Sequence, residues 1–427
     1  MASTHSRTAE IRAVARDNGA LAQQMLAELL RDLFQIAPRD VAINYDQYSL
    51  NSLNGFFRTD DGDFFFKFHQ EEGEEAMSGE YYRADILARA GLPVDQAVHM
   101  SVLPGEQILV YRRRTDARFS DVLRALDMDD DPKARAKAVT AERDLGGRVL
   151  SVYADSLHPI TPEEAAGEPI NRLFFERLID PATGAYPGGR LSSFYVGQTF
   201  DFPGASLSWD EFADARFVVN GIAYAKTVRE LFDGAHRRLS PRRLADAGGV
   251  VAHGDAHNAN VWYVDEGERA ALSFFDPAFA GEHVPTLLAE VKTTFHNILA
   301  HPLWLYDPEE LQQRYAAMAR YESGTLSIET DWALSAIRRD LLIQKMTEVW
   351  KPLLALLKSK SLLPDDWRDV VRYGLFLCPT LVMNLRAGAS RHNPTSSLIG
   401  FANAVRAGAE PLGQADELST LFDAIAP

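Results

Sequence analysis

Apolar residues recur at helical spacing over residues 8–35, and this pattern predicts one helix, or two helices broken near Gly19. From Val41 to Arg114 the pattern changes to short strands separated by turn residues, and Phe64–Phe68 is the most apolar of them. Residues 71–90 interrupt the strands with a helical pattern that is acidic at its start, where the helix dipole favours negative charge. A helical segment followed by a small sheet with one helix is therefore predicted.

The rest of the chain has mainly helical patterns. Residues 133–157 predict a long helix, and Ser208-Trp209-Asp210-Glu211 predicts a capping box that starts a helix running to about Phe232. From Val284 to the end, apolar positions again predict helices. Residues 158–207 hold Pro, Gly and many aromatic residues without a sustained period, which predicts an irregular insertion that serves as a lid or as part of a substrate site.

A chain of 427 residues is too long for one ordinary compact core, so two or three lobes are expected. The patterns divide the chain into an N-terminal helical extension over residues 1–40, a small N-lobe over residues 41–114 and a larger helical C-lobe over residues 115–427.

The composition is that of a soluble globular protein, with 46% hydrophobic and 24% charged residues. The net charge of −16 argues against nonspecific binding to nucleic acid or to an anionic membrane, and it favours a cationic substrate. No apolar run approaches the length of about 20 residues that spans a bilayer, and Met1–Arg7 lacks the apolar core of a signal peptide. A cytoplasmic location is predicted.

Cys378 is the single cysteine, which excludes an intrachain disulfide and a cysteine-rich zinc site. It stands among apolar residues, so a buried core cysteine is expected rather than a catalytic thiol.

The most informative stretch is Val250–Trp262, which predicts an apolar strand, a tight polar loop and a second apolar strand. The loop carries Asp255 and, five residues later, Asn260. A third oxygen ligand, Asp276, follows a predicted hairpin at the end of the strand Ser273–Phe275. Kinases use the spacing His-x-Asp-x-x-x-x-Asn, followed by an Asp at a strand end, to hold a hydroxyl and Mg²⁺-ATP together.

Each requirement of phosphoryl transfer has a candidate residue in this stretch. Asp255 lies where an acceptor hydroxyl approaches, so it is the predicted base and orienting group. Asn260 and Asp276 offer the hard oxygen ligands that Mg²⁺ prefers. The hairpin between them is expected to bring both to one end.

Lys67 stands inside a run of four Phe residues, where an unpaired charge is costly. It is either an edge-strand lysine whose amine reaches water or a lysine directed at a phosphate. Glu80, in the middle of the following predicted helix, is the candidate partner that orients it.

A zinc site at His253 and His257 is an alternative interpretation of the loop. The pair flanks a glycine in a loop, and the helical His-Glu-x-x-His pattern is absent, so His253 is instead expected to brace the loop by hydrogen bonds. Asp255, Asn260 and Asp276 could also be ordinary turn residues. Their joint occurrence downstream of Lys67 argues against that interpretation.

The sequence His253-Gly254-Asp255-Ala256-His257-Asn258-Ala259-Asn260, with Phe275-Asp276-Pro277, resembles the aminoglycoside phosphotransferase and choline kinase branch of the protein-kinase-like superfamily. The resemblance implies an α+β bilobal fold, with a small antiparallel-sheet N-lobe, a larger mainly helical C-lobe and ATP between them.

The same resemblance implies the roles of the site residues. Asp255 is the expected catalytic base, next to His253, and Asn260 and Asp276 are expected to hold Mg²⁺. Lys67 would contact the α and β phosphates of ATP and pair with Glu80. The segment Gln107–Arg114, which contains Tyr111, would end in the hinge that binds adenine.

Two departures from the family pattern stand out. The phosphate-covering loop has no G-x-G-x-x-G; Ser49–Gly55 stands in its place, with Ser52, Asn54 and Gly55 as the candidate phosphate-binding residues. The second Asp that the family commonly carries after its Gly-Asp-Pro segment is missing, since Leu287-Leu288-Ala289 replaces Asp-Leu-Ala. Whether Glu290 takes over its bracing role is left open.

These observations predict an ATP-dependent kinase that acts on a hydroxyl of a small molecule. An amino-bearing acceptor such as an aminoglycoside or an amino alcohol fits the acidic balance, but a sugar or another metabolite would use the same loop. By analogy, residues 158–207 and the helices after residue 284 would line the acceptor site. A protein kinase and a catalytically silent nucleotide-binding pseudokinase are the alternatives.

Overall fold

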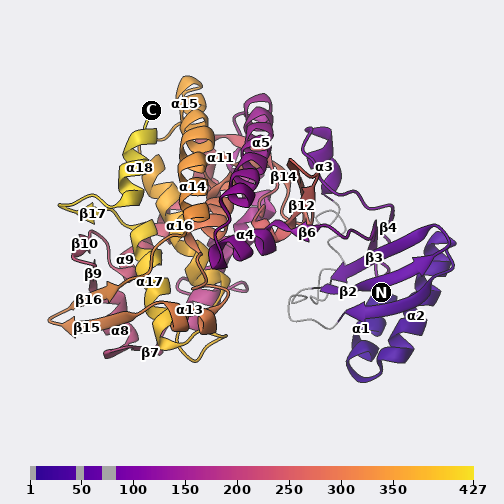
Figure 1. Ribbon diagram of the computed structural model, residues 1–427, viewed down its shortest axis with the longest axis horizontal. Coiled ribbons are helices and arrows are strands. Elements are labelled where there is room, and N and C mark those ends of the chain that lie inside the picture. The colour runs from indigo at the N-terminus through magenta and orange to yellow at the C-terminus, as the bar shows by residue number, and fades with distance from the viewer. Residues whose placement is uncertain (1–5, 45–51, 70–82) are drawn as a thin grey trace. The chain divides into compact units, whose positions relative to one another are not determined.

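The computed structural model describes residues 6–44, 52–69 and 83–427 (Figure 1). The chain divides into two compact units. Unit 1 comprises Met1–Asp85 and Val94–Asp116, and unit 2 comprises Ile86–Pro93 and Ala117–Pro427. Within the described residues, every helix is too short or too polar to cross a membrane.

Unit 1 contains a five-stranded antiparallel sheet, as predicted. The strand order is β1-β2-β3-β5-β4. The strands are β1 (Arg39–Asn44), β2 (Ser52–Thr59), β3 (Gly62–His69), β4 (His99–Ser101) and β5 (Ile108–Arg112).

The predicted N-terminal helical segment is confirmed, and of the two alternatives the structure has two helices that meet near Gly19 and share a hydrophobic core with this sheet. Helix α1 (Arg7–Asp17) ends at Asn18, whose side chain then caps α2 (Gly19–Phe34) by accepting a hydrogen bond from the backbone N–H of Leu21. Alternate residues of β3 face this core, which is formed by Ile11, Ala15, Ala22, Leu26, Leu29, Leu30, Ile43, Leu53, Phe57, Phe64, Phe66, Phe68, Ile108 and Val110.

The helix predicted over residues 71–90 falls partly outside the described residues. Its described end forms α3 (Ala84–Arg89). Glu80, the predicted partner of Lys67, lies outside the described residues.

Unit 2 combines many helices with small sheets. Its helices are α4 (Phe119–Met128), α5 (Pro132–Ser156), α6 (Pro162–Gly167), η2 (Pro169–Leu173), η3 (Phe175–Arg177), α7 (Gly189–Phe194), α8 (Trp209–Asp214), α9 (Val228–Arg238), α10 (Pro241–Leu244), η4 (Ala245–Ala247), η5 (Asn258–Asn260), α11 (Thr286–Ala289), α12 (Val291–Thr294), η6 (Phe295–Leu299), α13 (Pro308–Arg314), α14 (Ala336–Gln344), η7 (Lys345–Trp350), α15 (Lys351–Ser359), α16 (Trp367–Val382), α17 (Pro394–Gly408) and α18 (Glu417–Ile425). Its strands are β6 (Ala117–Arg118), β7 (Thr199–Phe202), β8 (Ala205–Ser208), β9 (Arg216–Val219), β10 (Ile222–Tyr224), β11 (Gly249–Ala252), β12 (Val261–Asp265), β13 (Ala270–Phe274), β14 (Gly281–Pro285), β15 (Ala317–Glu322), β16 (Thr325–Thr330) and β17 (Pro411–Leu412).

The long helix predicted from Ser208 to about Phe232 is wrong. The capping box at Ser208 is present, but α8 ends at Asp214 and a hairpin of β9 and β10 follows. Asn220 and Gly221 form its turn, with φ angles of 48° and 81°. Asn-Gly between β-branched and aromatic residues is a strong hairpin signal, and the turn favours two left-handed residues.

The purely helical pattern predicted after Val284 is also wrong. Strands β15 and β16 form a hairpin, and β16 pairs in parallel with β9. The resulting five-stranded sheet has the order β15-β16-β9-β10-β17, and most of its strands lie together at one edge of unit 2 in Figure 1. The turn between β15 and β16 again uses two left-handed residues, Ser323 and Gly324.

The segment 158–207 consists of short helices and the β7–β8 hairpin, so its irregular pattern is confirmed. Phe174, Tyr195 and Phe200 are fully buried. The segment is therefore part of the core of unit 2 rather than a cover laid over it, and its place in an acceptor site stays a prediction.

Candidate functional site

The predicted strand–loop–strand is confirmed around residues 249–265. Strand β11 leads into the loop, η5 closes the loop, and β12 pairs with β13 in a hairpin with Val261 opposite Phe274. One residue further, the backbone N–H of Phe275 donates a 2.9 Å hydrogen bond to the carbonyl of Asn260. The hairpin therefore brings the backbones of Asn260 and Asp276 to the same end.

Gly254 allows the loop to turn tightly. Its φ angle is 74°, and a Cβ at this position would lie 2.3 Å from the carbonyl oxygen of Phe279. Both the left-handed backbone and the close approach require glycine. The loop is thus packed directly against the segment that follows Asp276.

His253 braces the loop by hydrogen bonds, as predicted. Its Nδ1 accepts from the backbone N–H of Asp255 at 3.3 Å, so Nε2 carries the proton and donates to the carbonyl of Phe275 at 3.0 Å. Burial lowers the pKa of His253 despite these contacts and the nearby carboxylates, which keeps the ring neutral. Because both ring nitrogens are already engaged, His253 is poorly suited to bind zinc.

Within the residues that the structure describes, no group of three or more His, Cys, Asp or Glu side chains is arranged to hold a metal ion. A Mg²⁺ site built from one carboxylate and one amide, with water and phosphate oxygens completing the shell, needs no such group.

Asp255 is held as a carboxylate by a buried lysine. Its Oδ1 lies 3.1 Å from Nζ of Lys292, and its Oδ2 lies 3.9 Å from Nε2 of His257. Burial acts to raise the pKa of Asp255, but the attraction of Lys292, followed by that of His257, outweighs it and lowers the pKa below its ordinary value. Asp255 is therefore ionised at neutral pH and can accept a hydrogen bond from a hydroxyl.

Sequence reasoning missed Lys292. The lysine lies on α12, and its side chain is only 5% exposed. It follows the apolar run Leu287–Ala289, but Glu290, Thr293 and Thr294 flank it, so its signal of a buried charge in the sequence was only weak.

The orientation of Asn260 suits a cation ligand. Its Nδ2 donates a 3.0 Å hydrogen bond to the carbonyl oxygen of Asp255, which leaves Oδ1 as the amide atom that can bind a metal. Asp276 has a φ angle of 55°, a left-handed conformation that Asp tolerates better than most residues. The two residues fit a site for Mg²⁺, which favours one or two carboxylates with water and phosphate oxygens.

Asn297 braces the loop. The sequence left this role open, because the second Asp of the family pattern is missing. Its Oδ1 accepts a 2.7 Å hydrogen bond from the backbone N–H of Asn258 in the loop. Its own carbonyl accepts from Nη1 of Arg338, whose guanidinium also pairs with Asp127. The η6 turn therefore ties the loop that carries Asp255 to α14 and α4.

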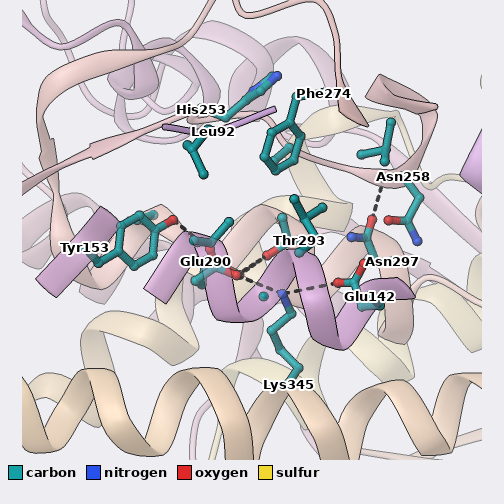
Figure 2. A pocket seen from close by; sticks show the side chains of 16 residues that line it. Leu92, Glu142, Tyr153, His253, Asn258, Phe274, Glu290, Thr293, Asn297 and Lys345 are labelled. Carbon is teal, nitrogen blue, oxygen red and sulfur yellow. Dashed lines mark hydrogen bonds and ion pairs between the residues drawn. The ribbon is translucent and has the colours of Figure 1, made fainter. Parts of the chain in front are cut away.

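Glu290 anchors a different part of the unit. Figure 2 shows it beside a small cavity of about 20 Å³, roughly room for one water. Its Oε1 accepts from the hydroxyl of Tyr153 at 2.7 Å, and its Oε2 accepts from Lys345 at 3.0 Å and from Thr293 at 2.9 Å. Glu290 thus fixes the start of α12, which carries Lys292.

In unit 1, one face of the sheet gathers several predicted nucleotide-binding residues. Lys67 lies in β3, 8% exposed, directly opposite Asn54 of β2. Tyr111 of β5 pairs with Phe65, two residues before Lys67. Because cross-strand partners share a face, these residues lie on the face opposite the core with α1 and α2.

The predicted phosphate loop Ser49–Gly55 is only partly described. From Ser52 onward it is strand β2 and not a loop, and the side chain of Ser52 lies outside the described residues. A Cβ at Gly55 would lie 2.0 Å from the carbonyl oxygen of Ala42 in β1. Packing against the neighbouring strand therefore explains this glycine.

No protein-family model and no curated protein sequence matches the chain. Solved structures do match. A thermostable mutant of aminoglycoside phosphotransferase APH(4)-Ia, in ternary complex with AMP-PNP and hygromycin B, aligns with 11% identity over 94% of this chain and 97% of its own, with a TM-score of 0.44. A microcompartment-associated aminopropanol kinase aligns with 11% identity over 96% and 99%, with a TM-score of 0.44. Plasmodium vivax ethanolamine kinase aligns with 8% identity over 95% of both chains, with a TM-score of 0.37.

These structures come from the branch that the His253–Asn260 motif resembles. Their TM-scores are all below 0.5, so the alignments by themselves decide neither the reaction nor the acceptor of this chain.

Proposed function

We propose that this protein is a kinase that transfers the γ-phosphoryl group of ATP to a hydroxyl of a small molecule. The observation that carries the proposal is the loop geometry around Asp255. An ionised, buried carboxylate lies in a loop whose hairpin brings Asn260 and Asp276 to one end. Phosphoryl transfer depends mainly on positioning and charge, and this arrangement supports both.

Asp255 accepts the hydrogen bond of the acceptor hydroxyl and takes its proton as the oxygen attacks the phosphorus. Lys292 keeps the carboxylate ionised and fixes its orientation. His253 holds the loop by bonding to Asp255 and to Phe275 on either side. Because the pKa of Asp255 is low, its main contribution is to orient the hydroxyl, with proton transfer late in the reaction.

The remaining roles follow the resemblance of the motif. Asn260 and Asp276 would hold Mg²⁺, which neutralises phosphate charge when it is bound. Lys67, paired with Glu80, would bind the α and β phosphates. Ser52, Asn54 and Gly55 would approach the phosphates, and Tyr111 would lie beside the adenine. An acceptor with an amino group was the expectation from the net charge of the chain.

Nucleotide binding is tested first, by the rise in melting temperature that ATP causes with and without Mg²⁺. The wild type should show a rise that requires Mg²⁺, and Asp276→Asn should lose most of it. Asp265→Asn is the matched control, because Asp265 lies at the opposite end of the same hairpin. No rise in the wild type would overturn the proposed function.

Transfer is tested with Asp255→Asn and labelled ATP against a panel of hydroxyl compounds. The variant should keep the rise caused by Mg²⁺-ATP and lose transfer by about 10³-fold or more, because the group that positions the hydroxyl is gone. Turnover close to that of the wild type would refute the role of Asp255.

A further inference from the structure

A group of cationic and imidazole side chains surrounds Asp255 in unit 2. Lys292 forms the ion pair described above, and His257 lies on the other carboxylate oxygen. The ring of His257 lies 5.9 Å from that of His296, which lies on η6 and bonds to the hydroxyl of Tyr306 at 2.7 Å. Burial lowers the pKa of both histidines, so one ammonium group and two neutral imidazole rings lie around the carboxylate.

Arg177 adds a positive charge within electrostatic range of Asp255, and the chain between Arg177 and Arg190 closes into a compact loop. The backbone N–H of Gly188 donates to the carbonyl of Leu178 at 2.7 Å. A Cβ at Gly189 would lie 2.9 Å from the carbonyl oxygen of Arg177. The loop therefore brings the backbones of the two arginines close together.

Arg190 is held in place by the end of α16. Its Nη1 donates to the carbonyl of Leu381 at 2.9 Å and to that of Val382 at 3.0 Å. Those carbonyls form the negative end of the helix dipole, which suits a guanidinium.

Arg177 has hydrogen-bonding capacity to spare. Its Nη1 is buried and has no hydrogen-bond partner among the described residues. Burial and the neighbouring Arg190 lower the pKa of Arg177 to about 10, while Asp255 and Cys378 act in the opposite direction. The guanidinium therefore remains positive at neutral pH and lies within electrostatic range of Asp255. A buried donor without an acceptor is costly, so a ligand that supplies the acceptor gains affinity there.

We propose that the acceptor of this kinase carries an oxyanion, a carboxylate or a phosphate, which binds the guanidinium of Arg177 while the acceptor hydroxyl meets Asp255. A planar guanidinium with open donors matches such a group. Asp255 is already paired with Lys292, so it offers little attraction to an ammonium group, and the positive charge of Arg177 repels one. The inference rests on the proposed kinase function and specifies its substrate class.

The net charge of −16 instead predicted a cationic acceptor. Net charge governs the distant field of a protein, but a bound substrate interacts with the charges within a few ångströms. The local arrangement therefore decides the class of acceptor.

The experiment compares acceptors that share a polyol or sugar core and carry an anionic, a neutral or a cationic group. One set is glycerate, glycerol 3-phosphate, glycerol and 3-aminopropane-1,2-diol; the other is glucuronate, glucose 6-phosphate, glucose and glucosamine. Binding is measured by calorimetry in the presence of Mg²⁺ and AMP-PNP, and transfer is measured with labelled ATP. An anionic member should bind at least 10-fold more tightly than the neutral and amino members of its set. A preference for the amino members, or no preference in either set, would overturn the inference.

The variant Arg177→Gln tests whether a preference for anionic acceptors depends on Arg177. A hydrogen bond between charged groups corresponds to roughly 10- to 100-fold in affinity, so KM for the anionic acceptor should rise by that factor with little change in kcat. Arg320→Gln is the matched control, because Arg320 is 77% exposed on β15 and carries the same charge. A fall in kcat that is equal for all acceptors would mean that Arg177 acts on the phosphoryl group, which also overturns the inference.

The two proposals fail in different ways. If Mg²⁺-ATP fails to raise the melting temperature while anion binding still depends on Arg177, the kinase function fails and the anion site stands. If Mg²⁺-ATP binds but amino compounds are preferred, only the acceptor class fails.

Discussion

Oδ1 of Asp255 lies 3.1 Å from Nζ of Lys292, and the two side chains are 14% and 5% exposed. The pair joins the loop that carries Asp255 to α12, whose start Glu290 anchors to α5 and η7. Two charges removed from water in this way depend on each other, because neither has enough solvent to replace its partner. The ionisation of the proposed base is thus coupled to the packing of the helices beneath the loop.

Replacing Lys292 should therefore affect both stability and activity. Lys292→Met leaves the Asp255 carboxylate buried without its ion-pair partner, and breaking a buried pair costs about 3–5 kcal/mol of unfolding free energy. Turnover should fall by about 10²-fold, because the carboxylate loses its orientation. Denaturant unfolding and labelled-ATP transfer measure the two effects. Lys292→Arg keeps the charge and should recover most of the stability. Equal losses of stability and turnover in Lys292→Met and Lys292→Arg would show that the ion pair does not account for them.

Gly254 should be intolerant of any side chain. Gly254→Ala forces a Cβ against the Phe279 carbonyl and places a non-glycine residue at a φ of 74°. The expected cost is about 1–3 kcal/mol of unfolding free energy, with a loss of most transfer activity because the loop must shift. Gly267→Ala is the control, since Gly267 has a φ of 84° in the β12–β13 turn but open space around its Cβ. Equal losses of activity in the two variants would contradict this explanation.

Lys345 is shared by two buried carboxylates, those of Glu290 and Glu142, at 3.0 and 3.4 Å (Figure 2). Burial raises the pKa of Glu142 despite Lys345, which acts to lower it. A raised folded-state pKa favours the protonated form, so this contribution to stability is present at low pH and is lost as pH rises through the folded-state pKa.

Glu142→Gln should therefore raise the unfolding free energy at pH 7 by about 1 kcal/mol, and the gain should shrink as pH falls toward 4.5, the ordinary pKa of Glu. Lys345→Met should instead lower stability by about 3–5 kcal/mol, because two carboxylates lose their counter-ion. Denaturant unfolding between pH 4.5 and pH 8 measures both. If Glu142→Gln destabilises the protein as much as Lys345→Met, Glu142 acts as an essential counter-ion and not as excess charge.

His392 should make the fold sensitive to acid. Its buried ring contacts the hydroxyl of Ser396 at 3.1 Å, and burial lowers the pKa of His392 from 6.5 to about 4. The unfolded state therefore binds a proton more readily, so stability is full above pH 6.5 and is lost as pH falls toward 4. Protonation of His392 should therefore lower the unfolding free energy by about 3 kcal/mol.

The variant His392→Gln should reduce the fall in unfolding free energy between pH 7.5 and pH 4.5. Burial also lowers the pKa values of His296 and His301 well below their ordinary value, so part of the pH dependence should remain. An unchanged dependence in the variant would show that His392 does not contribute.

Some of the fold followed from local patterns, and some required long-range pairing. The two N-terminal helices and the β12–β13 hairpin were predicted because each is specified by periodicity or by nearby turn residues. The helix predicted from Ser208 to about Phe232 was wrong because the hairpin turn at Asn220-Gly221 was overlooked. The pairing of β16 with β9 could not be predicted because the two strands are remote in sequence and parallel, and a sequence pattern does not report such a partner.

The site divides in the same way. Asp255 and Asn260 were predicted because they lie five positions apart in one short loop between two strands, and Asp276 followed from the adjacent hairpin. Lys292, Arg177 and Asn297 come from distant segments, and only folding brings Lys292 and Asn297 into contact with the loop and Arg177 within electrostatic range of Asp255. Short-range spacing thus indicated phosphoryl transfer. The charge around Asp255, on which the choice of acceptor depends, was decided by the tertiary structure, because electrostatic attraction acts between neighbours in space.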